Sequence, residues 1–302
     1  RVRPYIASLA YTGLGGELTD DVLRYFSALE FFHLFCLVHD DIIDEGSTRH
    51  GVATIHQFVY ERLKKEQRLG NLQKLGDAHA LLIGDLLFSW AIERMHVRYP
   101  GKTRGKDRTI ALFFQMINET VLGQMIDVDL TSKPRATSAL IEQKMSLKTA
   151  RYTFTRPLQI GASLVRWSKP IERFCSEFGE ALGIAFQIQD DLLDLLGQSQ
   201  TTLKSTFLDL ATRQQTVYTQ HVHDHGTTED IILLQSLTGR GLSDAEREDA
   251  RALFERTGAI RACQKRMDDA FTQAERVLAR AKFLQNTSEF ESLIAFIRTR
   301  SA

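Results

Sequence analysis

Two aspartate clusters with the same spacing constrain this sequence more than any other feature. The DDxxD pattern occurs twice, about half the chain apart, in six residues: Asp40, Asp41 and Asp44, then Asp190, Asp191 and Asp194. Each cluster follows an apolar run, so its carboxylates should be attached to a core helix. Because close carboxylates repel one another and resist transfer out of water, the pattern predicts a strongly cationic ligand between the clusters.

Helical geometry indicates what that cation is. Residues i and i+4 share one helix face, which places Asp40 beside Asp44. Gly46 and Gly197 follow the clusters and predict that the carboxylates lie in the last helical turns. Oxygen ligands without cysteine suit Mg²⁺, or Mn²⁺ in its place, with phosphate oxygens completing the coordination. One such cluster could equally be a solvated helix end, but two copies on two apolar helices favour metal binding.

Bulk composition excludes several classes of protein. The 302 residues carry 38 basic and 38 acidic side chains, so the net charge argues against a nucleic-acid-binding surface. No run approaches the roughly 18 apolar residues of a membrane helix, and we expect no transmembrane segment. Three scattered cysteines are typical of reduced thiols in a cytoplasmic protein.

The hydrophobic periodicity is helical almost throughout, and no period-2 strand is convincing. Thr19 predicts an N-cap for a helix that runs to the first cluster, and Ser243 with Glu246 predicts a capping box. Pro157 predicts a kink inside a helix. The further predicted helices span residues 52–68, 74–98, 107–131, 137–165, 170–196, 204–222, 228–237, 244–256 and 259–281. With no low-complexity linker, residues 1–302 are predicted to form one all-α domain.

Further motifs accompany the clusters in a fixed order along the chain. They are Arg1-Val2-Arg3-Pro4, Glu30 with His33, His39, Arg49 with Gly51, Gly84-Asp85, Gly123-Gln124 with Asp127, Lys148-Thr149, Phe186-Gln187, and Lys204 with Asp209. Together with both clusters, this set resembles the trans-isoprenyl diphosphate synthases of the polyprenyl synthetase family, most of all the geranylgeranyl and farnesyl diphosphate synthases. Arg1 matches an internal point of the family's first motif, so we expect further residues before it.

The resemblance implies a fold and an activity. The fold would be a single-domain helical bundle with a central cavity, assembled as a homodimer. The activity would be Mg²⁺-dependent condensation of isopentenyl diphosphate with an allylic diphosphate. We expect a C20 product, with C15 as the alternative.

The resemblance also implies a role for each site residue. Three Mg²⁺ ions would be held by Asp40, Asp44 and Asp190, and the remaining aspartates, Asp41, Asp191 and Asp194, would bind more weakly. The allylic diphosphate would be gripped by three basic residues, Arg49, Lys148 and Lys204. The carbocation would be stabilised by two oxygen dipoles, Thr149 and Gln187. The diphosphate of the second substrate would contact Arg1, His33 and His50.

Two departures from the family pattern bear on turnover. His50 stands where a second arginine is usual, and a largely neutral imidazole cannot form a bidentate fork. We therefore predict weak isopentenyl diphosphate binding that improves below about pH 6.5. Gln214 replaces a usual basic residue, which the neighbouring Arg213 could offset. These departures keep open a second reading, a non-catalytic or modulatory subunit of a heteromeric synthase.

A class I terpene cyclase is a third reading. Such enzymes share the helical architecture and the first cluster. Their second metal motif ends in glutamate, whereas this chain has Gln198 at the corresponding position. Lys148 and His33 suit two diphosphates, which favours the synthase.

Three residues before the first cluster are candidates for the floor of a product channel. They lie eight, five and four positions before Asp40 and are Phe32, Phe35 and Cys36. The two rings share a similar helix face and could form a double floor. The alternative is that both are ordinary core residues.

Overall fold

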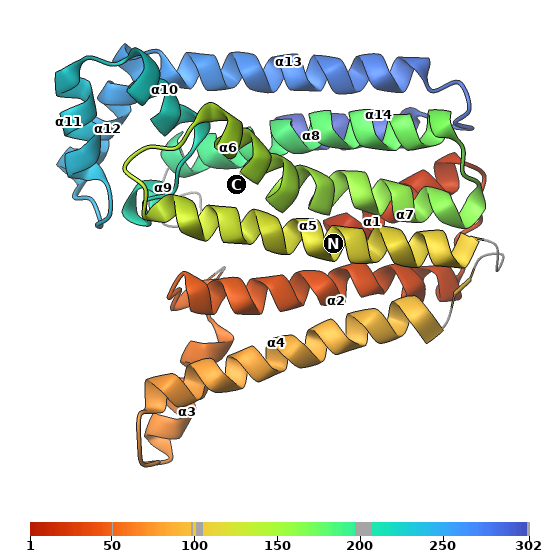
Figure 1. The fold of residues 1–302 in the computed structure, drawn as a ribbon, viewed down its shortest axis with the longest axis horizontal. Coiled ribbons are helices and arrows are strands. Elements are labelled where there is room, and N and C mark those ends of the chain that lie inside the picture. Colours follow the sequence, from red (N-terminus) through yellow and green to blue (C-terminus); the bar gives the residue numbers. More distant parts are fainter. Residues whose placement is uncertain (50, 98, 101–104, 197–206, 301–302) are drawn as a thin grey trace.

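The computed structural model describes residues 1–49, 51–97, 99–100, 105–196 and 207–300 and is helical almost throughout, as predicted (Figure 1). The first half contains α1 (Val2–Gly13), α2 (Asp20–Ile43), β1 (Thr48–Arg49), β2 (Val52–Ala53), α3 (Ile55–Lys65), α4 (Leu72–Val97) and α5 (Lys106–Thr131). The second half contains α6 (Ser138–Lys144), the π-helix η2 (Met145–Thr155), α7 (Arg156–Val165), α8 (Lys169–Leu196), α9 (Leu208–Ala211), α10 (Val217–His225), α11 (Thr228–Leu237), α12 (Asp244–Arg256), α13 (Ala259–Arg280) and α14 (Ser288–Thr299).

The long helices lie side by side. α2 packs against α4, while η2 lies between α5 and α8, and α8 also contacts α13 (Figure 1). Buried aromatic side chains fill the spaces between them, such as Phe32 and Phe113 between α2 and α5 and Phe178 and Phe290 between α8 and α14. Both aspartate clusters therefore end helices that are anchored in the core.

Local sequence signals set several helix starts. The hydroxyl of Thr19 accepts the backbone N–H of Val22 at the start of α2, and Ser243 with Glu246 forms the predicted capping box of α12. The predicted bounds 228–237 and 244–256 match α11 and α12. At α2 and α12 the capping side chains marked the helix start in the sequence.

Other expectations about the elements were wrong. A continuous helix over 204–222 does not form, because Arg213 adopts a left-handed backbone conformation with φ 60° and Thr216 caps a new helix, α10. Residues 204–206 lie outside the described part of the chain. Two short strands pair antiparallel where none was predicted, with Thr48 opposite Ala53. The sequence analysis also missed α1 and α14, which both lack a side-chain cap.

The helix predicted over 137–165 contains an 11-residue π-helix, η2, directly before Pro157. Proline has no N–H to continue the hydrogen-bond ladder, and π-helical turns are rare and frequently lie at functional sites. Glycines let the neighbouring helices approach its backbone. A Cβ on Gly183 of α8 would lie 2.3 Å from the Cα of Ala150, and one on Gly123 of α5 would lie 2.6 Å from the backbone N of Lys148.

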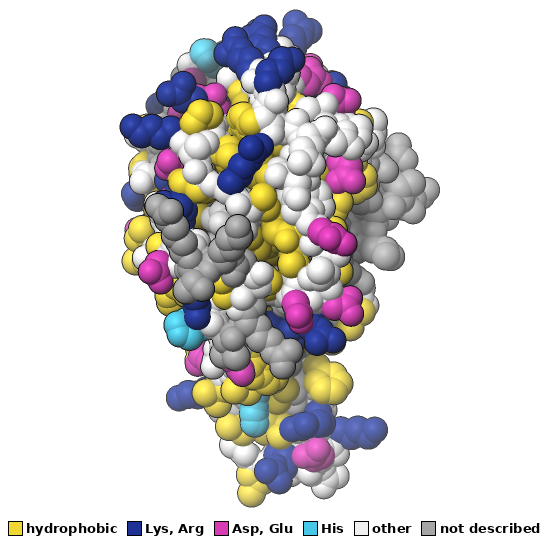
Figure 2. All heavy atoms as spheres, turned by 90° about the vertical axis from the view of Figure 1, so that its right-hand side faces the viewer, with side chains coloured by type: hydrophobic (Ala, Val, Ile, Leu, Met, Phe, Trp, Pro, Cys, Tyr) yellow, Lys and Arg dark blue, Asp and Glu magenta, His cyan; other side chains and the backbone are white. Residues whose placement is uncertain are grey.

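Two helices are long and apolar enough to cross a membrane by length and composition, Asp20–Ile43 and Leu72–His96. The count of uninterrupted apolar residues had not detected them. This is weak evidence for a membrane span, because core helices of soluble proteins meet the same criterion. In Figure 2, hydrophobic side chains are exposed on the lower, narrower part of the molecule, where α3 and α4 lie.

Candidate active site

A cavity of about 550 Å³ lies among α1, α2, α5, η2 and α8. Two of the six cluster aspartates line it, Asp40 from α2 and Asp190 from α8. These are the first residues of the two DDxxD patterns. The two clusters therefore open onto one shared space.

The first cluster contains two aspartates, Asp40 and Asp44, whose pKa values are raised by partial burial. Burial raises the pKa of Asp40 to about 6, although the ammonium group of Lys148 acts in the opposite direction. Burial also raises the pKa of Asp44, which caps the C-terminus of α2. Asp41 accepts hydrogen bonds from Arg49, with its Oδ1 2.6 Å from Nη2 and 2.8 Å from Nε. Arg49 is thus engaged by the cluster itself.

The second cluster is held by other partners. Arg300 pairs with Asp190. Burial raises the pKa of Asp191 to about 7, while its Oδ1 accepts a 2.8 Å hydrogen bond from Gln187. Asp194 accepts the backbone N–H groups of Leu208 and Asp209 at 3.0 and 3.1 Å and so fixes the start of α9.

The donor set fits magnesium that arrives with a phosphate ligand. In the part of the chain that the structure describes, no group of three or more His, Cys, Asp or Glu side chains is gathered closely enough to hold a metal ion alone. Mg²⁺ commonly binds through one or two carboxylates and substrate phosphates. Asp40 and Asp190 supply such carboxylates on one cavity, and the charge at Asp40 lacks a full counter-charge.

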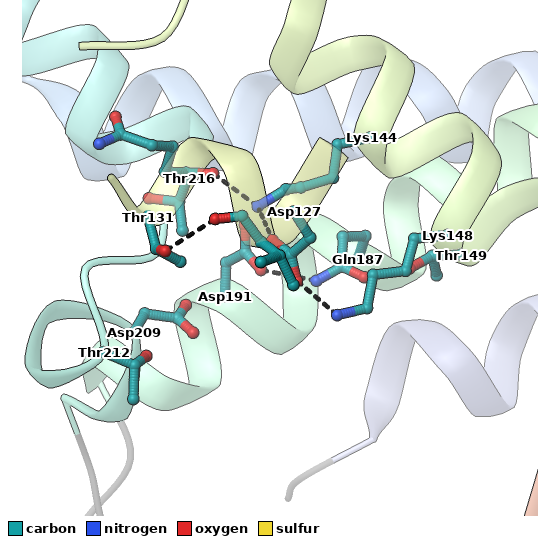
Figure 3. A network of polar contacts seen from close by, with 12 residues as sticks. Asp127, Thr131, Lys144, Lys148, Thr149, Gln187, Asp191, Asp209, Thr212 and Thr216 are labelled. Carbon is teal, nitrogen blue, oxygen red and sulfur yellow. Dashed lines mark hydrogen bonds and ion pairs between the residues drawn. The ribbon is translucent and has the colours of Figure 1, made fainter. Parts of the chain in front are cut away.

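A lysine pair shares one carboxylate beside the cavity (Figure 3). Asp127 of α5 lies 2.5 Å from Nζ of Lys148 and 3.1 Å from Nζ of Lys144, which also donates to the carbonyl oxygen of Gln215 at 2.7 Å. Burial alone would raise the pKa of Asp127, but the two ammonium groups hold it below its ordinary value. The sequence motif contained Asp127 but did not reveal that it anchors Lys148.

The two predicted carbocation-stabilising residues are joined in the structure. Thr149 donates its hydroxyl hydrogen to Oε1 of Gln187, and the amide of Gln187 donates to Asp191 (Figure 3). Both side chains line the cavity. These two hydrogen bonds fix the orientation of the Gln187 amide, with its oxygen toward Thr149 and its nitrogen toward Asp191.

Arg3, and not Arg1, brings positive charge to the cavity from the N-terminal motif. The Arg1 side chain is 76% exposed, lies 3.7 Å from Glu30 and does not line the cavity. Arg3 lines it, with the guanidinium carbon 3.9 Å from the centroid of the Tyr152 ring. The predicted contact of Arg1 with the second substrate stays a prediction, and Arg3 is the arginine of this motif that lines the cavity.

His33 also lines the cavity, and its Nδ1 lies 2.8 Å from the hydroxyl oxygen of Tyr152. Burial lowers the pKa of His33 to about 3, and the neighbouring Arg3 and Arg49 add to the effect. The imidazole is therefore neutral at physiological pH. It can form hydrogen bonds to a diphosphate but adds no charge.

Of the three candidate floor residues, Phe35 and Cys36 line the cavity and Phe32 does not. Phe32 is fully buried, with its ring centroid 5.5 Å from that of Phe35, which it supports from behind. His39 packs edge-on against Phe35 at 4.6 Å and fits against α4 only because Gly84 has no Cβ. The sequence motifs contained His39 and Gly84 but not this contact.

Three further basic residues were predicted to bear on diphosphate binding, and one of them lies in the described part of the chain. His50 and Lys204 lie outside the described residues. Arg213 lies against Gly239, whose added Cβ would be 2.3 Å from Nε of the arginine, and it does not line the described cavity. Whether Arg213 offsets the basic group that Gln214 lacks stays a prediction.

Comparisons with known proteins point to one family. A family model described as polyprenyl synthetase matches residues 1–255. Octaprenyl diphosphate synthase from Escherichia coli (strain K12) is 25% identical over 294 residues, which cover 97% of this chain and 83% of that protein. Geranylfarnesyl diphosphate synthase from Natronomonas pharaonis is 31% identical over 240 residues, which cover 80% of this chain and 64% of that protein.

A solved structure is similar over almost the whole chain. Geranylgeranyl pyrophosphate synthase from Corynebacterium glutamicum, in complex with isoprenyl diphosphate and magnesium, has a TM-score of 0.90 and 26% sequence identity. The match covers 99% of this chain and 85% of that chain. The names of these three relatives agree in the type of enzyme and differ in the prenyl group.

Proposed function

Because this chain belongs to the polyprenyl synthetase family, we propose that it is a Mg²⁺-dependent trans-prenyltransferase that joins isopentenyl diphosphate to an allylic diphosphate. One observation carries this proposal. Asp40 and Asp190 line the same cavity, and the same cavity is walled by Lys148 and by apolar side chains such as Phe35 and Phe186. A single space thus offers carboxylates for metal, a cation for phosphate and an apolar wall for a prenyl chain.

The first step is departure of diphosphate from the allylic substrate. Bound Mg²⁺, which Mn²⁺ could replace, would neutralise the charge that develops on the leaving oxygens. We expect three ions, held by Asp40, Asp44 and Asp190. Lys148 contributes an ammonium group from the side of η2, and its exchange from Asp127 to the diphosphate leaves Asp127 paired with Lys144. Lys144 therefore prevents the freed carboxylate from being buried without a partner.

The second step is attack of the isopentenyl double bond on the allylic cation. Thr149 and Gln187 line the cavity, and their oxygen atoms are the dipoles that would stabilise positive charge there. The diphosphate of isopentenyl diphosphate would lie at Arg3 with His33 as a neutral hydrogen-bonding partner. The diphosphate released from the allylic substrate can take the final proton, so no protein base is needed.

The product is proposed to be C20, with C15 as the alternative. Phe35 closes the apolar side of the cavity and is backed by Phe32 and by Phe88, whose ring centroid lies 5.0 Å away. A floor that rests on other buried rings resists displacement by a growing chain. The relatives carry octaprenyl, geranylfarnesyl and geranylgeranyl names, so chain length has to be measured.

A homodimer is proposed through the exposed apolar faces of α4 and α5. Large hydrophobic side chains that are 40% or more exposed and do not line the cavity lie along both helices: Leu75, Leu81, Leu82, Leu86 and Trp90 on α4, and Phe114 and Leu122 on α5. Contiguous exposed apolar surface of this kind marks interaction sites. Sedimentation of the purified protein would test it, since Leu82→Glu with Leu86→Glu should yield monomers.

The activity is tested by incubating the purified protein alone with Mg²⁺, dimethylallyl diphosphate and isopentenyl diphosphate, and by sizing the products. Longer prenyl diphosphates support the synthase. Hydrocarbons formed from one allylic substrate would identify a cyclase. Absence of product without an added partner chain would identify a subunit of a heteromeric synthase.

A further inference from the structure

Arg300, directly after α14, reaches the second aspartate cluster from a position 110 residues away in the chain. Its Nη2 pairs with Oδ1 of Asp190. Its guanidinium carbon lies 4.1 Å from the centroid of the Phe186 ring, in a cation–π contact. Phe186 and Asp190 both line the cavity, so a guanidinium group stands where a cation is needed.

Packing fixes the approach of this arginine. The apolar stripe of α14 is buried against the core through four residues, Phe290, Leu293, Ile294 and Ile297. At its end, the side-chain amide of Gln189 donates to the carbonyl oxygens of Arg298 at 3.4 Å and Arg300 at 3.2 Å. Gln189 directly precedes Asp190 in α8. Two adjacent residues of α8 therefore hold the backbone and the side chain of Arg300.

We propose that Arg300 is a resident counter-ion of Asp190 that the magnesium–diphosphate complex has to displace, so that α14 tunes the metal affinity of the site. This inference rests on the proposed function. In the absence of metal, the guanidinium holds the carboxylate of Asp190 in place at the cavity wall. When metal arrives, the same carboxylate cannot serve both cations, so binding requires the ion pair to open.

The pair is suited to exchange. The Asp190 side chain is 39% exposed and that of Arg300 is 21% exposed, so water reaches the ion pair. Partly exposed pairs of this type are weak and are readily replaced. Competition of this strength lowers the apparent metal affinity by roughly three- to tenfold. Loss of Arg300 should therefore tighten metal binding.

The experiment measures binding of Mn²⁺ together with inorganic pyrophosphate by isothermal titration calorimetry, without turnover. Arg300→Gln removes the charge, and Arg300→Lys keeps the charge without the planar guanidinium. Arg298→Gln is the matched control on the same arm, because Arg298 pairs with Glu275 at 2.9 Å and stacks on Phe271, away from Asp190. Thermal unfolding of each variant, with chelator and with Mg²⁺ and pyrophosphate, provides a second measurement.

The inference expects Arg300→Gln to bind roughly three- to tenfold more tightly than the wild type, Arg300→Lys to lie between them, and Arg298→Gln to match the wild type. With chelator, Arg300→Gln should unfold at a lower temperature, and ligand should stabilise it by a larger increment. Equal or weaker binding by Arg300→Gln overturns the inference. If Asp190→Asn then loses binding, the proposed function stands without it; if Asp190→Asn binds like the wild type, both fail.

Discussion

Asp40 and Asp190 hold the same position in two clusters of identical spacing, and both side chains line one cavity, yet their partners differ. Asp40 is partly buried, and this burial raises its pKa to about 6 because the nearby Lys148 offsets only part of the cost. Asp190 is paired with Arg300 from the end of α14. Asp40 thus lacks a paired cation of its own in this structure, whereas Asp190 has one in Arg300.

The remaining members of the clusters extend the contrast. Asp191 is bound by Gln187, and Asp194 accepts two backbone N–H groups at α9, so the second cluster is tied to the protein at each position. In the first cluster, Asp41 has Arg49, while burial raises the pKa of Asp44. Equal spacing therefore fixes the helix face but not the charge balance, and the first cluster should depend more on bound metal.

The largest expected effect is a loss of kcat/KM, and it should differ between the neighbouring residues Asp40 and Asp41. Asp40→Asn should lower kcat/KM on the order of 10³-fold, because Asp40 faces the cavity and would bind metal at the leaving group. Asp41→Asn should lower it roughly tenfold, because Asp41 acts by holding Arg49. Steady-state kinetics at saturating Mg²⁺ measure both. Equal losses in the two variants would remove the distinction between them.

The second prediction concerns stability without metal. Asp40→Asn should raise the free energy of unfolding by about 1–3 kcal/mol above pH 6. The folded pKa of Asp40 is raised from 3.8 to about 6, so the folded state binds its proton more tightly than the unfolded chain. Ionisation of Asp40 therefore destabilises the folded state increasingly as the pH rises from 3.8 to about 6, and the full destabilisation is present above pH 6. Urea unfolding with chelator at pH 7.5 and at about pH 4, where the gain should vanish, is the measurement.

The second cluster offers a control with the opposite sign. Asp194→Asn should lower the free energy of unfolding by about 1–2 kcal/mol, because it weakens acceptance of the N–H groups of Leu208 and Asp209. Stabilisation by Asp194→Asn, or destabilisation by Asp40→Asn at neutral pH, would contradict the proposed difference in charge balance.

Local signals made much of the fold predictable, and long-range contacts explain the rest. Thr19 and the clusters themselves located α2, because capping and periodicity act within a few residues. The close approach of Gly183 on α8 to Ala150 of η2 was not predictable, since it joins residues on two different helices. The helix predicted across residues 212–216 failed because Arg213 adopts a left-handed conformation that is unusual for arginine.

The candidate site follows the same rule. The motif order identified both clusters, Lys148, Thr149 and Gln187, all of which the structure brings to or beside one cavity. It did not distinguish Arg1 from Arg3, although residues two apart on a helix point about 200° apart. Arg300 was not predictable at all, because no local pattern connects it to Asp190 across 110 residues.

A third prediction uses the residue five positions before each cluster. That residue is Phe35 on α2, which lines the cavity, and Ala185 on α8, which is buried and has no ring. At this position, the first helix therefore offers a ring that could stop a growing chain and the second does not. Phe35→Ala should shift the main product to longer chains by at least one five-carbon unit, measured by chromatography of the dephosphorylated products. Phe31→Ala is the matched control, because Phe31 packs on Trp90 and does not line the cavity; an unchanged product profile in Phe35→Ala would exclude Phe35 as the floor.

The smallest expected effect is on the pH dependence of the KM for isopentenyl diphosphate, and it distinguishes His50 from His33. His50 lies outside the described residues, and its ordinary imidazole pKa predicts that the KM for isopentenyl diphosphate falls roughly threefold from pH 8 to pH 6. His33 cannot produce this change, because burial lowers its pKa to about 3 and it stays neutral over that range. His50→Arg should therefore lower the KM and abolish its pH dependence, whereas His33→Gln should keep the dependence. A KM that is constant across this range in the wild type would show that His50 does not contact the diphosphate. Arg3 would then be the residue that supplies positive charge to the diphosphate of isopentenyl diphosphate.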